Sequence, residues 1–318
     1  MAALILAPRA AMPAAPAAGF RQQARSLIAQ FGGKVDFAAV DLKTGQRLEI
    51  RGSHLAPTAS VIKLPVMVEA FYLMQAGKLS WSQPIPVSAW DRVPGSGIVQ
   101  FLSVQKLRLG DAITLMIDLS DNSAANAVID AIRRASAPPP PASPPPGAFP
   151  LAGIQAVNAR MRQLGLKHTR LLAYVFHSPH QLSADRQRFG LGVSTPDDMV
   201  RLLTLIDRHR ILTPAACERM LTILSHQMDI DAFPRYTSLP GVTWMHKTGA
   251  LNALRNDVGI VRTPAGDVAM AGFAYASPDQ RWTADNAALI VLAHLAQVTL
   301  EKFGMLPVVK TAASGNGR

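Results

Sequence analysis

Cysteine, aromatic residues and long apolar runs are all scarce in this chain of 318 residues. Cys217 is the single cysteine, which excludes a disulfide framework and a cysteine-based metal site, and its surroundings indicate a small core residue. No apolar run is long enough to cross a bilayer as a helix. Histidine, aspartate and glutamate do not cluster at metal-ligand spacing, so we expect no metal, and nothing indicates another cofactor.

The charge balance is basic, but the basic residues are not concentrated in one stretch. Lysine and arginine number 32 against 21 acidic residues, which gives a net charge of +11. Because the arginines are scattered, aromatics make up only 6% of the chain and no nucleic-acid-binding motif occurs, we expect no nucleic-acid partner. The charge is compatible with a weak attraction to anionic cell-envelope material.

Changes in composition divide the chain into a leader, one folded domain and a tail. Residues 1–19 are rich in Ala and Pro, but their apolar piece is short and no basic residue precedes it. Two interpretations stay open: a degenerate or truncated export signal, with the protein periplasmic or secreted, and a disordered leader. The domain spans 20–304, with a Pro-rich surface insertion at 137–150 that is either inert or bound by a proline-recognising partner. A flexible tail is expected at 305–318.

The spacing of apolar residues predicts strands at both ends of the domain and helices between them. Strands are expected at 34–40, 46–50, 242–248, 257–262 and 268–276. Helices are expected at 20–31, 58–75, 112–119, 123–134, 151–164 and 283–303, and between 195 and about 227. Sequential strands usually pair, so we expect an α/β (α+β) fold. Its antiparallel sheet of about five strands is built from both termini, flanked by helices, with an all-helical lobe inserted.

Three residues make specific predictions about helix ends. Asp111 is expected to cap the helix at 112–119, and Thr195 to cap a helix whose first residue is Pro196. Pro65 conflicts with a helix at 58–75, since proline removes a helix hydrogen bond. That helix is therefore expected to start late or to bend.

The start of the helix expected at 58–75 carries two residues that can act together as a nucleophile and its base. Ser60 and Lys63, three residues apart at a helix start, lie on one face. A serine hydroxyl becomes a nucleophile when a base takes its proton, and a lysine with a lowered pKa can be that base. The helix N-terminus adds N–H groups that suit an oxyanion. Ser-x-x-Lys is common by chance, so the pair alone indicates no function.

Two later motifs support a functional role for this pair. SVIK at 60–63, SDN at 120–122 and KTG at 247–249 stand in order at a helix start, an inter-helix loop and a strand end. Together they are a strong signal, and VPGSG at 93–97 and TPDDM at 195–199 support it. Over 20–304 the chain resembles the class A β-lactamases, members of the penicillin-recognising serine enzymes. The resemblance implies a β-lactamase/transpeptidase-like fold and a serine hydrolase that forms an acyl-enzyme.

The resemblance also implies the catalytic residues. Ser60 would be the acylated nucleophile, and Lys63 a base or proton relay beside it. Ser120 would pass protons between Lys247 and the departing lactam nitrogen. These roles match the needs of acyl transfer, which requires a nucleophile, a base and a proton donor for the leaving group.

Substrate-binding residues follow from the same resemblance. They are expected to be Asn122, Thr248, Gly249, Ala250 and Arg255. Thr248 would bind the substrate carboxylate together with Lys247, and Asn122 would hold the side-chain amide of the substrate. The N–H group of Ala250, with that of the nucleophile, would form the oxyanion hole. Arg255 would add charge for the carboxylate, although its offset from the KTG motif differs slightly from that of the family's usual arginine.

One departure from the family concerns the long loop at 167–191. In typical class A enzymes a glutamate there activates the water that releases the acyl group, and alignment of LGLKHTRL at 164–171 places Val175 at that position. Pro179 falls where an asparagine usually helps to hold the same water. Between 51 and 217 the only glutamate is Glu69, on the opening helix. The usual deacylating base is therefore expected to be absent.

Several substitutes for that base stay open. Lys63 could serve both half-reactions, or His177, His180 or Asp185 could supply a base from the loop. Alternatively, the acyl-enzyme could persist without turnover.

Three functions therefore remain. The first is a β-lactamase, with a place in antibiotic resistance or β-lactam catabolism. The second is a D,D-peptidase or esterase, and the third a β-lactam- or peptidoglycan-binding protein without turnover. Each acts on a small-molecule β-lactam or a peptidoglycan-like peptide, and we expect a monomer.

Overall fold

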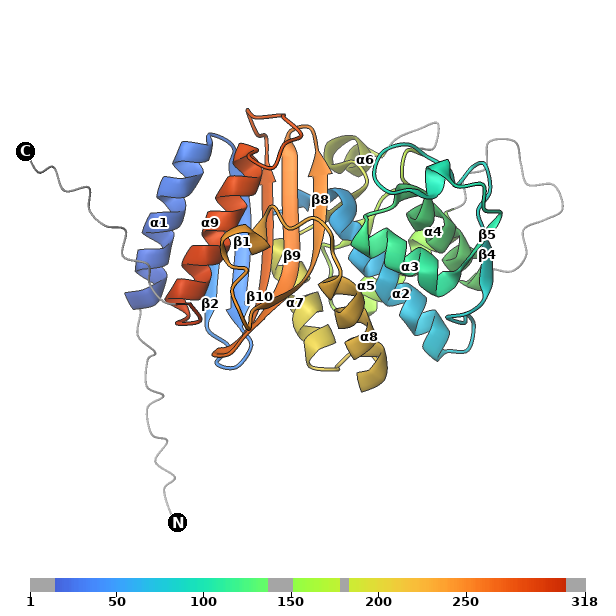
Figure 1. Cartoon of the computed structure of the whole chain (residues 1–318), viewed down its shortest axis with the longest axis horizontal. Coiled ribbons are helices and arrows are strands. Elements are labelled where there is room, and N and C mark those ends of the chain that lie inside the picture. Colours follow the sequence, from blue (N-terminus) through green and yellow to red (C-terminus); the bar gives the residue numbers. More distant parts are fainter. Residues whose placement is uncertain (1–14, 137–150, 178–182, 307–318) are drawn as a thin grey trace, which may run out of the picture.

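The computed structural model describes residues 15–136, 151–177 and 183–306 (Figure 1). The expectations for the first part of the leader, for the insertion at 137–150 and for most of the tail lie outside these residues. Within the described part of the chain, no helix is long and apolar enough to span a membrane.

A five-stranded antiparallel sheet forms the centre of the fold, in the order β2-β1-β10-β9-β8. Its strands are β1 (Lys34–Asp41), β2 (Arg47–Ile50), β8 (Thr243–Leu251), β9 (Leu254–Thr263) and β10 (Gly266–Tyr275). β1 pairs with β10 from Lys34 opposite Tyr275 to Asp41 opposite Val268, which joins the two ends of the chain. The predicted sheet built from both termini is confirmed.

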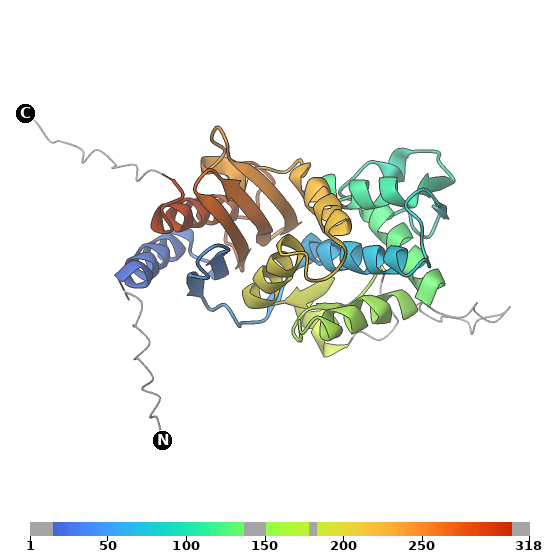
Figure 2. The ribbon, with the colours of Figure 1, turned by 90° about the horizontal axis from the view of Figure 1, so that it is seen from below.

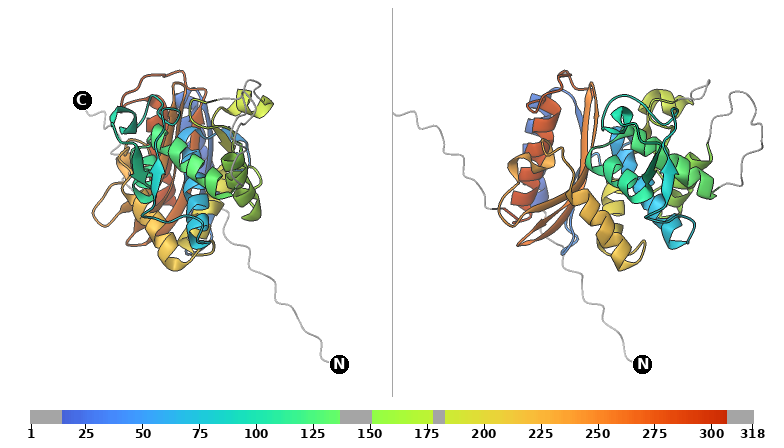
Figure 3. Two further views of the ribbon diagram at one scale, coloured as in Figure 1. Left: turned by 90° about the vertical axis from the view of Figure 1, so that its right-hand side faces the viewer. Right: turned by 45° about the vertical axis from the view of Figure 1, so that its right-hand side comes forward.

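Helices cover both faces of this sheet. α1 (Ala15–Phe31) and α9 (Ala287–Lys302) lie side by side on one face, and the helical lobe lies against the other (Figures 1 and 3). The alternation of β1 explains this arrangement: Phe37 belongs to the same buried cluster as Phe20 of α1 and Leu292 of α9, whereas Ala38 belongs to the core on the opposite face. Because both faces are covered, β9 is buried over most of its length.

The lobe is assembled around α2 (Lys63–Gln75), which runs through its middle (Figure 2). α2 contacts helices on several sides, and most of its residues are buried, which fits its almost continuous apolar sequence. The other larger helices are α3 (Leu109–Asp118), α4 (Asn122–Ser136), α5 (Ala152–Gln163), α7 (Pro196–Asp207) and α8 (Pro214–Ser225).

Short elements connect these parts. They are the strands β3 (Ala56–Pro57), β4 (Pro84–Pro86), β5 (Lys106–Arg108), β6 (Arg170–Leu171) and β7 (Gly192–Ser194), the helix α6 (Ala184–Phe189), and the 3₁₀ turns η1 (Ala59–Ile62), η2 (Val99–Phe101) and η3 (Phe233–Tyr236). η1 matters most for function, because it carries Ser60 and joins β3 to α2.

Some predicted helix ends are confirmed and others are wrong. Thr195 caps α7 by accepting a hydrogen bond from the main-chain N–H of Asp198. The late start predicted as one answer to Pro65 is confirmed, since α2 begins at Lys63 and the proline falls in its first turn. The prediction for Asp111 is wrong: α3 begins at Leu109, so this carboxylate lies inside the first turn, where it still complements the helix dipole.

Candidate active site

The turn that carries Ser60 is held in an uncommon backbone conformation. Ala59 adopts a left-handed φ of 43°, which a residue other than glycine rarely does unless its surroundings impose it. Those surroundings include Asn256 of β9, whose Nδ2 donates to the carbonyls of Pro57 at 2.8 Å and Thr58 at 3.1 Å. The sheet thus fixes the segment that leads to Ser60, which is itself half-buried.

Lys63 connects this turn to the SDN motif. Its Nζ donates to the carbonyl of Ser120 at 2.6 Å, to Ser120 Oγ at 3.3 Å and to Asn122 Oδ1 at 2.8 Å. Burial lowers the pKa of Lys63 well below its ordinary value, and the charge of Lys247 lowers it further, while Asp121 opposes the shift. Burial therefore favours the neutral amine at this position, which is the form that can act as a base.

The SDN turn is shaped by the VPGSG loop. Ser120 has a left-handed φ of 53° between α3 and α4. The next residue, Asp121, accepts hydrogen bonds from the main-chain N–H groups of Ile98 at 2.7 Å and Val99 at 2.8 Å. At Gly97 a Cβ atom would overlap the Asp121 carboxyl, so only glycine lets the loop approach this closely. The loop thereby holds Ser120 in place.

The KTG motif lies on β8, the edge strand of the sheet, next to η1. A Cβ atom at Gly249 would lie 2.6 Å from the Thr58 carbonyl oxygen and 3.2 Å from the Ser60 nitrogen, so the glycine permits close approach to the nucleophile turn. Because β8 is an edge strand, alternate N–H groups are directed away from β9. The strand end therefore supplies donors beside Ser60.

Lys247 is fully buried beneath this edge, and its Nζ donates to the Thr248 carbonyl at 2.8 Å. Burial lowers the pKa of Lys247 to about 8, although Asp229, Asp257 and Asp118 raise it in part. Below that pH the side chain is a cation, which suits a substrate carboxylate.

Two cavities meet at Ser60. The smaller, of about 290 Å³, is lined by Ser60, Ser96, Asp118, Leu119, Ser120, Gln227, Met228, Asp229, Thr248, Gly249, Ala250 and Trp282. The larger, of about 660 Å³, is lined by Ala59, Ser60, Gly95, Ser96, Asn122, Val175, Phe176, Arg186, Gly190, Leu191, Ala250, Leu251, Asn252, Ala253 and Trp282. A ligand that reaches Ser60 can therefore place one part beside the KTG and SDN motifs and another beside Asn122.

This arrangement of a serine, two buried lysines and two cavities can be compared with known proteins. A sequence model of the β-lactamase enzyme family (Beta-lactamase2) matches residues 19–303. The chain belongs to this β-lactamase enzyme family.

Individual members are distant in sequence but similar in fold. A β-lactamase of Rhodobacter capsulatus is 24% identical over 260 residues, which cover 82% of this chain and 81% of that protein. With β-lactamases of Pseudomonas aeruginosa the match is shorter, and the chain spans about half (46%) of their length. The crystal structure of a β-lactamase from Sphaerobacter thermophilus matches with a TM-score of 0.75 and 26% identity, covering 91% of this chain and 98% of that one.

Another solved structure with a similar fold is that of a protein named PBP-A. It is a mutant of PBP-A in which a glutamate replaces a leucine, described as an acyl-enzyme complex with penicillin G. It matches with a TM-score of 0.74 and 22% identity, covering 91% of this chain and 97% of that one. At this identity the likeness shows the fold alone. The family model and the class A neighbours confirm the resemblance to class A β-lactamase-like serine enzymes.

Within this β-lactamase fold, the long loop brings Val175 to the larger cavity. Val175 is 7% exposed, and its main chain is held on both sides by the Asn126 amide, with N–H donating at 2.8 Å and C=O accepting at 3.1 Å. Among the described residues that line this cavity, none is an aspartate or a glutamate. Val175 therefore brings an aliphatic side chain to this cavity.

Two of the proposed substitute bases, His177 and Asp185, make their contacts away from the cavities. The ring of His177 stacks on Trp90 with centroids 3.9 Å apart and donates to the Trp90 carbonyl at 2.7 Å. Asp185 forms an ion pair with Arg170 at 2.8 Å. His177 and Asp185 are not among the described residues that line the two cavities. His180, like Pro179, lies outside the described residues.

Arg255 does not reach the β-lactamase cavities either. It is 4% exposed, and its guanidinium donates to the main-chain carbonyls of Leu251, Leu254 and Arg281. The Arg255 guanidinium also makes a cation–π contact with Trp282, whose ring centroid lies 4.5 Å from the guanidinium carbon. These contacts leave it poorly placed to bind a substrate carboxylate.

Several residues that line the cavities were not predicted from the sequence. Ser96 lies in the VPGSG loop, which the sequence marks only as a supporting stretch. Asp118 precedes the SDN motif by two positions, and burial raises its pKa to about 6. Phe176 and Trp282 lie in loops with no periodic pattern. Adjacency to Ser120 and Val175 could have indicated Asp118 and Phe176, but no local signal marks Trp282.

Proposed function

We propose that this chain is a serine hydrolase of the class A β-lactamase type, which opens β-lactam amides through an acyl-enzyme on Ser60 and releases the product slowly. The observation that carries the proposal is the position of Lys63. Its amine is buried, has a pKa well below the ordinary value, and contacts Ser120 and Asn122 beneath the cavities that meet at Ser60.

Acylation follows from this geometry in balanced steps. The neutral Lys63 amine takes the proton of Ser60 Oγ as this oxygen attacks the lactam carbonyl carbon. The tetrahedral oxyanion is stabilised by the N–H groups of Ser60 and Ala250. When the C–N bond breaks, the nitrogen takes a proton from Ser120 Oγ, which recovers one from the Lys63 ammonium 3.3 Å away. In this proposal Lys63 replaces Lys247, the partner of Ser120 expected from the sequence, because the Lys247 Nζ donates to the Thr248 carbonyl.

Substrate binding divides between the two cavities. Thr248, which lines the smaller cavity, binds the carboxylate through its hydroxyl donor, and the buried Lys247 next to it on β8 contributes its charge. Asn122, beside the larger cavity, retains one free lone pair and one free N–H after its contacts with Lys63 and Pro94, and these bind the side-chain amide.

Slow release is supported by Val175. An aliphatic side chain cannot take a proton from water, and a general base is typically worth about 10²–10⁴ in rate. The same observation favours a second candidate, a D,D-peptidase or penicillin-binding protein that acts on a peptidoglycan-like peptide. The PBP-A structure, a penicillin G acyl-enzyme of a variant with an introduced glutamate, has the same fold. With either substrate class, we propose that the protein acts in the periplasm or outside the cell, and that it is a monomer.

Rapid-mixing kinetics with a chromogenic cephalosporin test the proposal. We expect a burst of about one product per protein, followed by a much slower steady state, because acylation outpaces release. The Ser60→Ala variant is expected to show neither phase. Fast linear turnover without a burst would contradict slow release, and the absence of both phases in the native protein would contradict β-lactam acylation. Release of D-alanine from a D-Ala-D-Ala peptide would favour the second candidate.

Acylation should also depend on pH through Lys247. Its pKa of about 8 means that raising the pH through this value removes the positive charge that binds the carboxylate. The second-order acylation rate is expected to fall above about pH 8, by up to about tenfold per pH unit. The matched control is the methyl ester of the same β-lactam, which has no carboxylate and should not show this fall. A rate unchanged well above pH 8, or the same fall with the ester, would contradict the role of Lys247.

A further inference from the structure

Trp282 is a large aromatic side chain exposed at the mouth of the site. It lies between β10 and α9, is 64% exposed, and lines both cavities that meet at Ser60. Water contact with so much apolar surface is unfavourable, and exposed apolar side chains around a cavity mark a place where ligand contacts them.

The Trp282 ring is held by a hydrogen bond to Asn252 and by the guanidinium of Arg255. The Trp282 Nε1 donates to Asn252 Oδ1 at 3.1 Å, and the Arg255 guanidinium carbon lies 4.5 Å from the ring centroid. A guanidinium at this distance from an aromatic face is attracted to it. Arg255 is itself fixed, because it donates to the carbonyl of Arg281, the residue before Trp282, at 2.8 Å, and to the carbonyls of Leu251 and Leu254.

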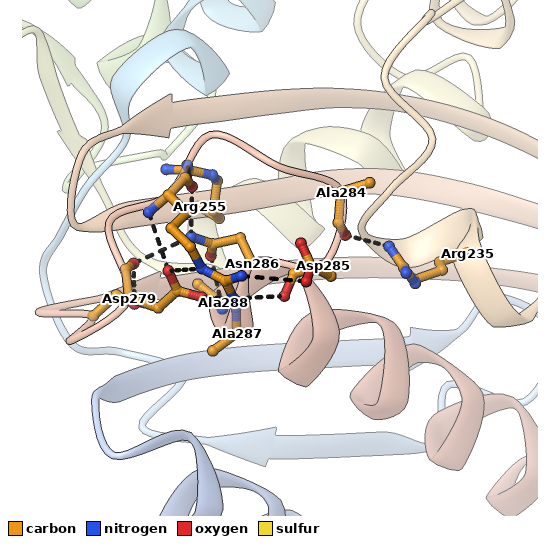
Figure 4. Close-up of polar contacts among 10 residues, drawn as sticks. Arg235, Arg255, Asp279, Ala284, Asp285, Asn286, Ala287 and Ala288 are labelled. Atoms are coloured by element: carbon orange, nitrogen blue, oxygen red, sulfur yellow. Dashed lines mark hydrogen bonds and ion pairs between the residues drawn. The ribbon is translucent and has the colours of Figure 1, made fainter.

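The segment that carries Trp282 is anchored at both ends (Figure 4). The Asp279 carboxylate accepts hydrogen bonds from the Arg281 side chain at 2.9 and 3.0 Å and from the main-chain N–H of Ala287 at 2.9 Å. Asn286 caps α9, and its Nδ2 donates to the carbonyls of Asp279 and Arg281. Because the ring is pre-organised, a ligand that stacks on it loses little entropy in ordering the protein.

Other exposed apolar side chains surround the same cavity. Phe176 is 64% exposed with a left-handed φ of 57°, and Leu251 is 51% exposed. Together with Val175 and Trp282 they give the larger cavity apolar walls on more than one loop, next to Asn122. A planar aromatic group fits such walls, because it can stack on the indole and bury apolar area.

We propose that Trp282 is a specificity-determining residue, which selects substrates that carry a planar aromatic group on the acyl side of the reacting carbonyl. Arg255 is a positioning residue that holds the indole in place. The reacting bond in this inference rests on the proposed function, whereas the aromatic selectivity rests on the cavity and does not require Ser60 to react.

The test uses two cephalosporins that differ only in the acyl substituent, phenylacetyl or acetyl. Acylation rates are measured in the native protein, and dissociation constants by calorimetry in the Ser60→Ala variant, where no acylation occurs. We expect a preference for the phenylacetyl compound of roughly tenfold in both measurements. Trp282→Ala should reduce this ratio to about two or less, with a larger loss for the phenylacetyl than for the acetyl compound, and Trp282→Phe should retain most of the ratio.

Two further variants separate positioning from general structure. Arg255→Met should lower the phenylacetyl preference more than the acetyl rate, and the loss of its hydrogen bonds to main-chain carbonyls should also lower the melting temperature. The control is Tyr236→Ala, which removes an exposed aromatic that packs on His294 outside both cavities and should change neither compound. A preference that survives Trp282→Ala, or an equal loss for both compounds, would overturn the inference. If Ser60→Ala binds with the expected preference but the native protein is never acylated, the proposed function fails and the role of Trp282 stands. Absence of preference in Ser60→Ala overturns that role.

Discussion

Replacing Lys63 by methionine is expected to lower the rate of Ser60 acylation by about 10³-fold, because it removes the base that activates the hydroxyl. Methionine keeps the length of the side chain but has no titratable nitrogen. The variant leaves Asn122 Oδ1 without its buried donor, which should cost about 1–3 kcal/mol of unfolding free energy. Rapid-mixing acylation rates and thermal melting measure the two effects separately.

The matched control is Lys78→Met, which changes an exposed lysine shortly after the end of α2. Acylation and melting temperature should both stay close to native in this variant. A folded Lys63→Met protein that acylates within about tenfold of the native rate would show that another group deprotonates Ser60.

The second large effect concerns release of the acyl group. Val175→Glu is expected to raise the deacylation rate by about 10²-fold or more, because it introduces a carboxylate that can take a proton from the hydrolytic water. The Asn126 amide holds the main chain of residue 175 from both sides, so the new side chain should enter the larger cavity that reaches Ser60. The lifetime of the acyl-enzyme, followed by intact mass after removal of excess β-lactam, measures the change.

Val175→Gln separates the base from the shape of the side chain. Glutamine has nearly the same size and polarity but cannot accept a proton, so release should stay slow. Equal acceleration by both variants would indicate a steric effect, and no acceleration by the glutamate variant would contradict the assignment of residue 175. Because position 175 is almost fully buried, melting temperatures of both variants accompany the kinetics.

The features that sequence predicted well are those encoded locally. Alternation in β1 and the turn after it specify a hairpin, and Thr195 followed by Pro196 specifies the start of α7. The three motifs also predicted which segments would meet, since Lys63 contacts the SDN turn and Gly249 packs on the nucleophile turn. Short motifs succeed here because each needs a particular backbone conformation as well as a side chain.

The features that escaped prediction depend on contacts between distant segments. The sequence offers Arg255 as a charged residue after the KTG motif. The carbonyls that accept its hydrogen bonds belong to the β8–β9 hairpin and to the loop before α9, and Arg255 does not line the cavities. Trp282 becomes a cavity wall only because Arg255 and Asn252 fix it. Asp111 is not the cap because α3 begins at Leu109, three residues before the predicted start at 112. No residue pattern within one segment records such arrangements.

Direct location of the acyl group tests the central claim, that Ser60 is the acylated nucleophile. The protein is mixed with a β-lactam, quenched in acid and digested with trypsin, which should release residues 52–63 as one peptide. We predict that this peptide gains the full mass of the β-lactam and that fragmentation places the added mass on Ser60 rather than on Ser53 or Thr58. An adduct on another residue, or no adduct while product still forms, would contradict the account.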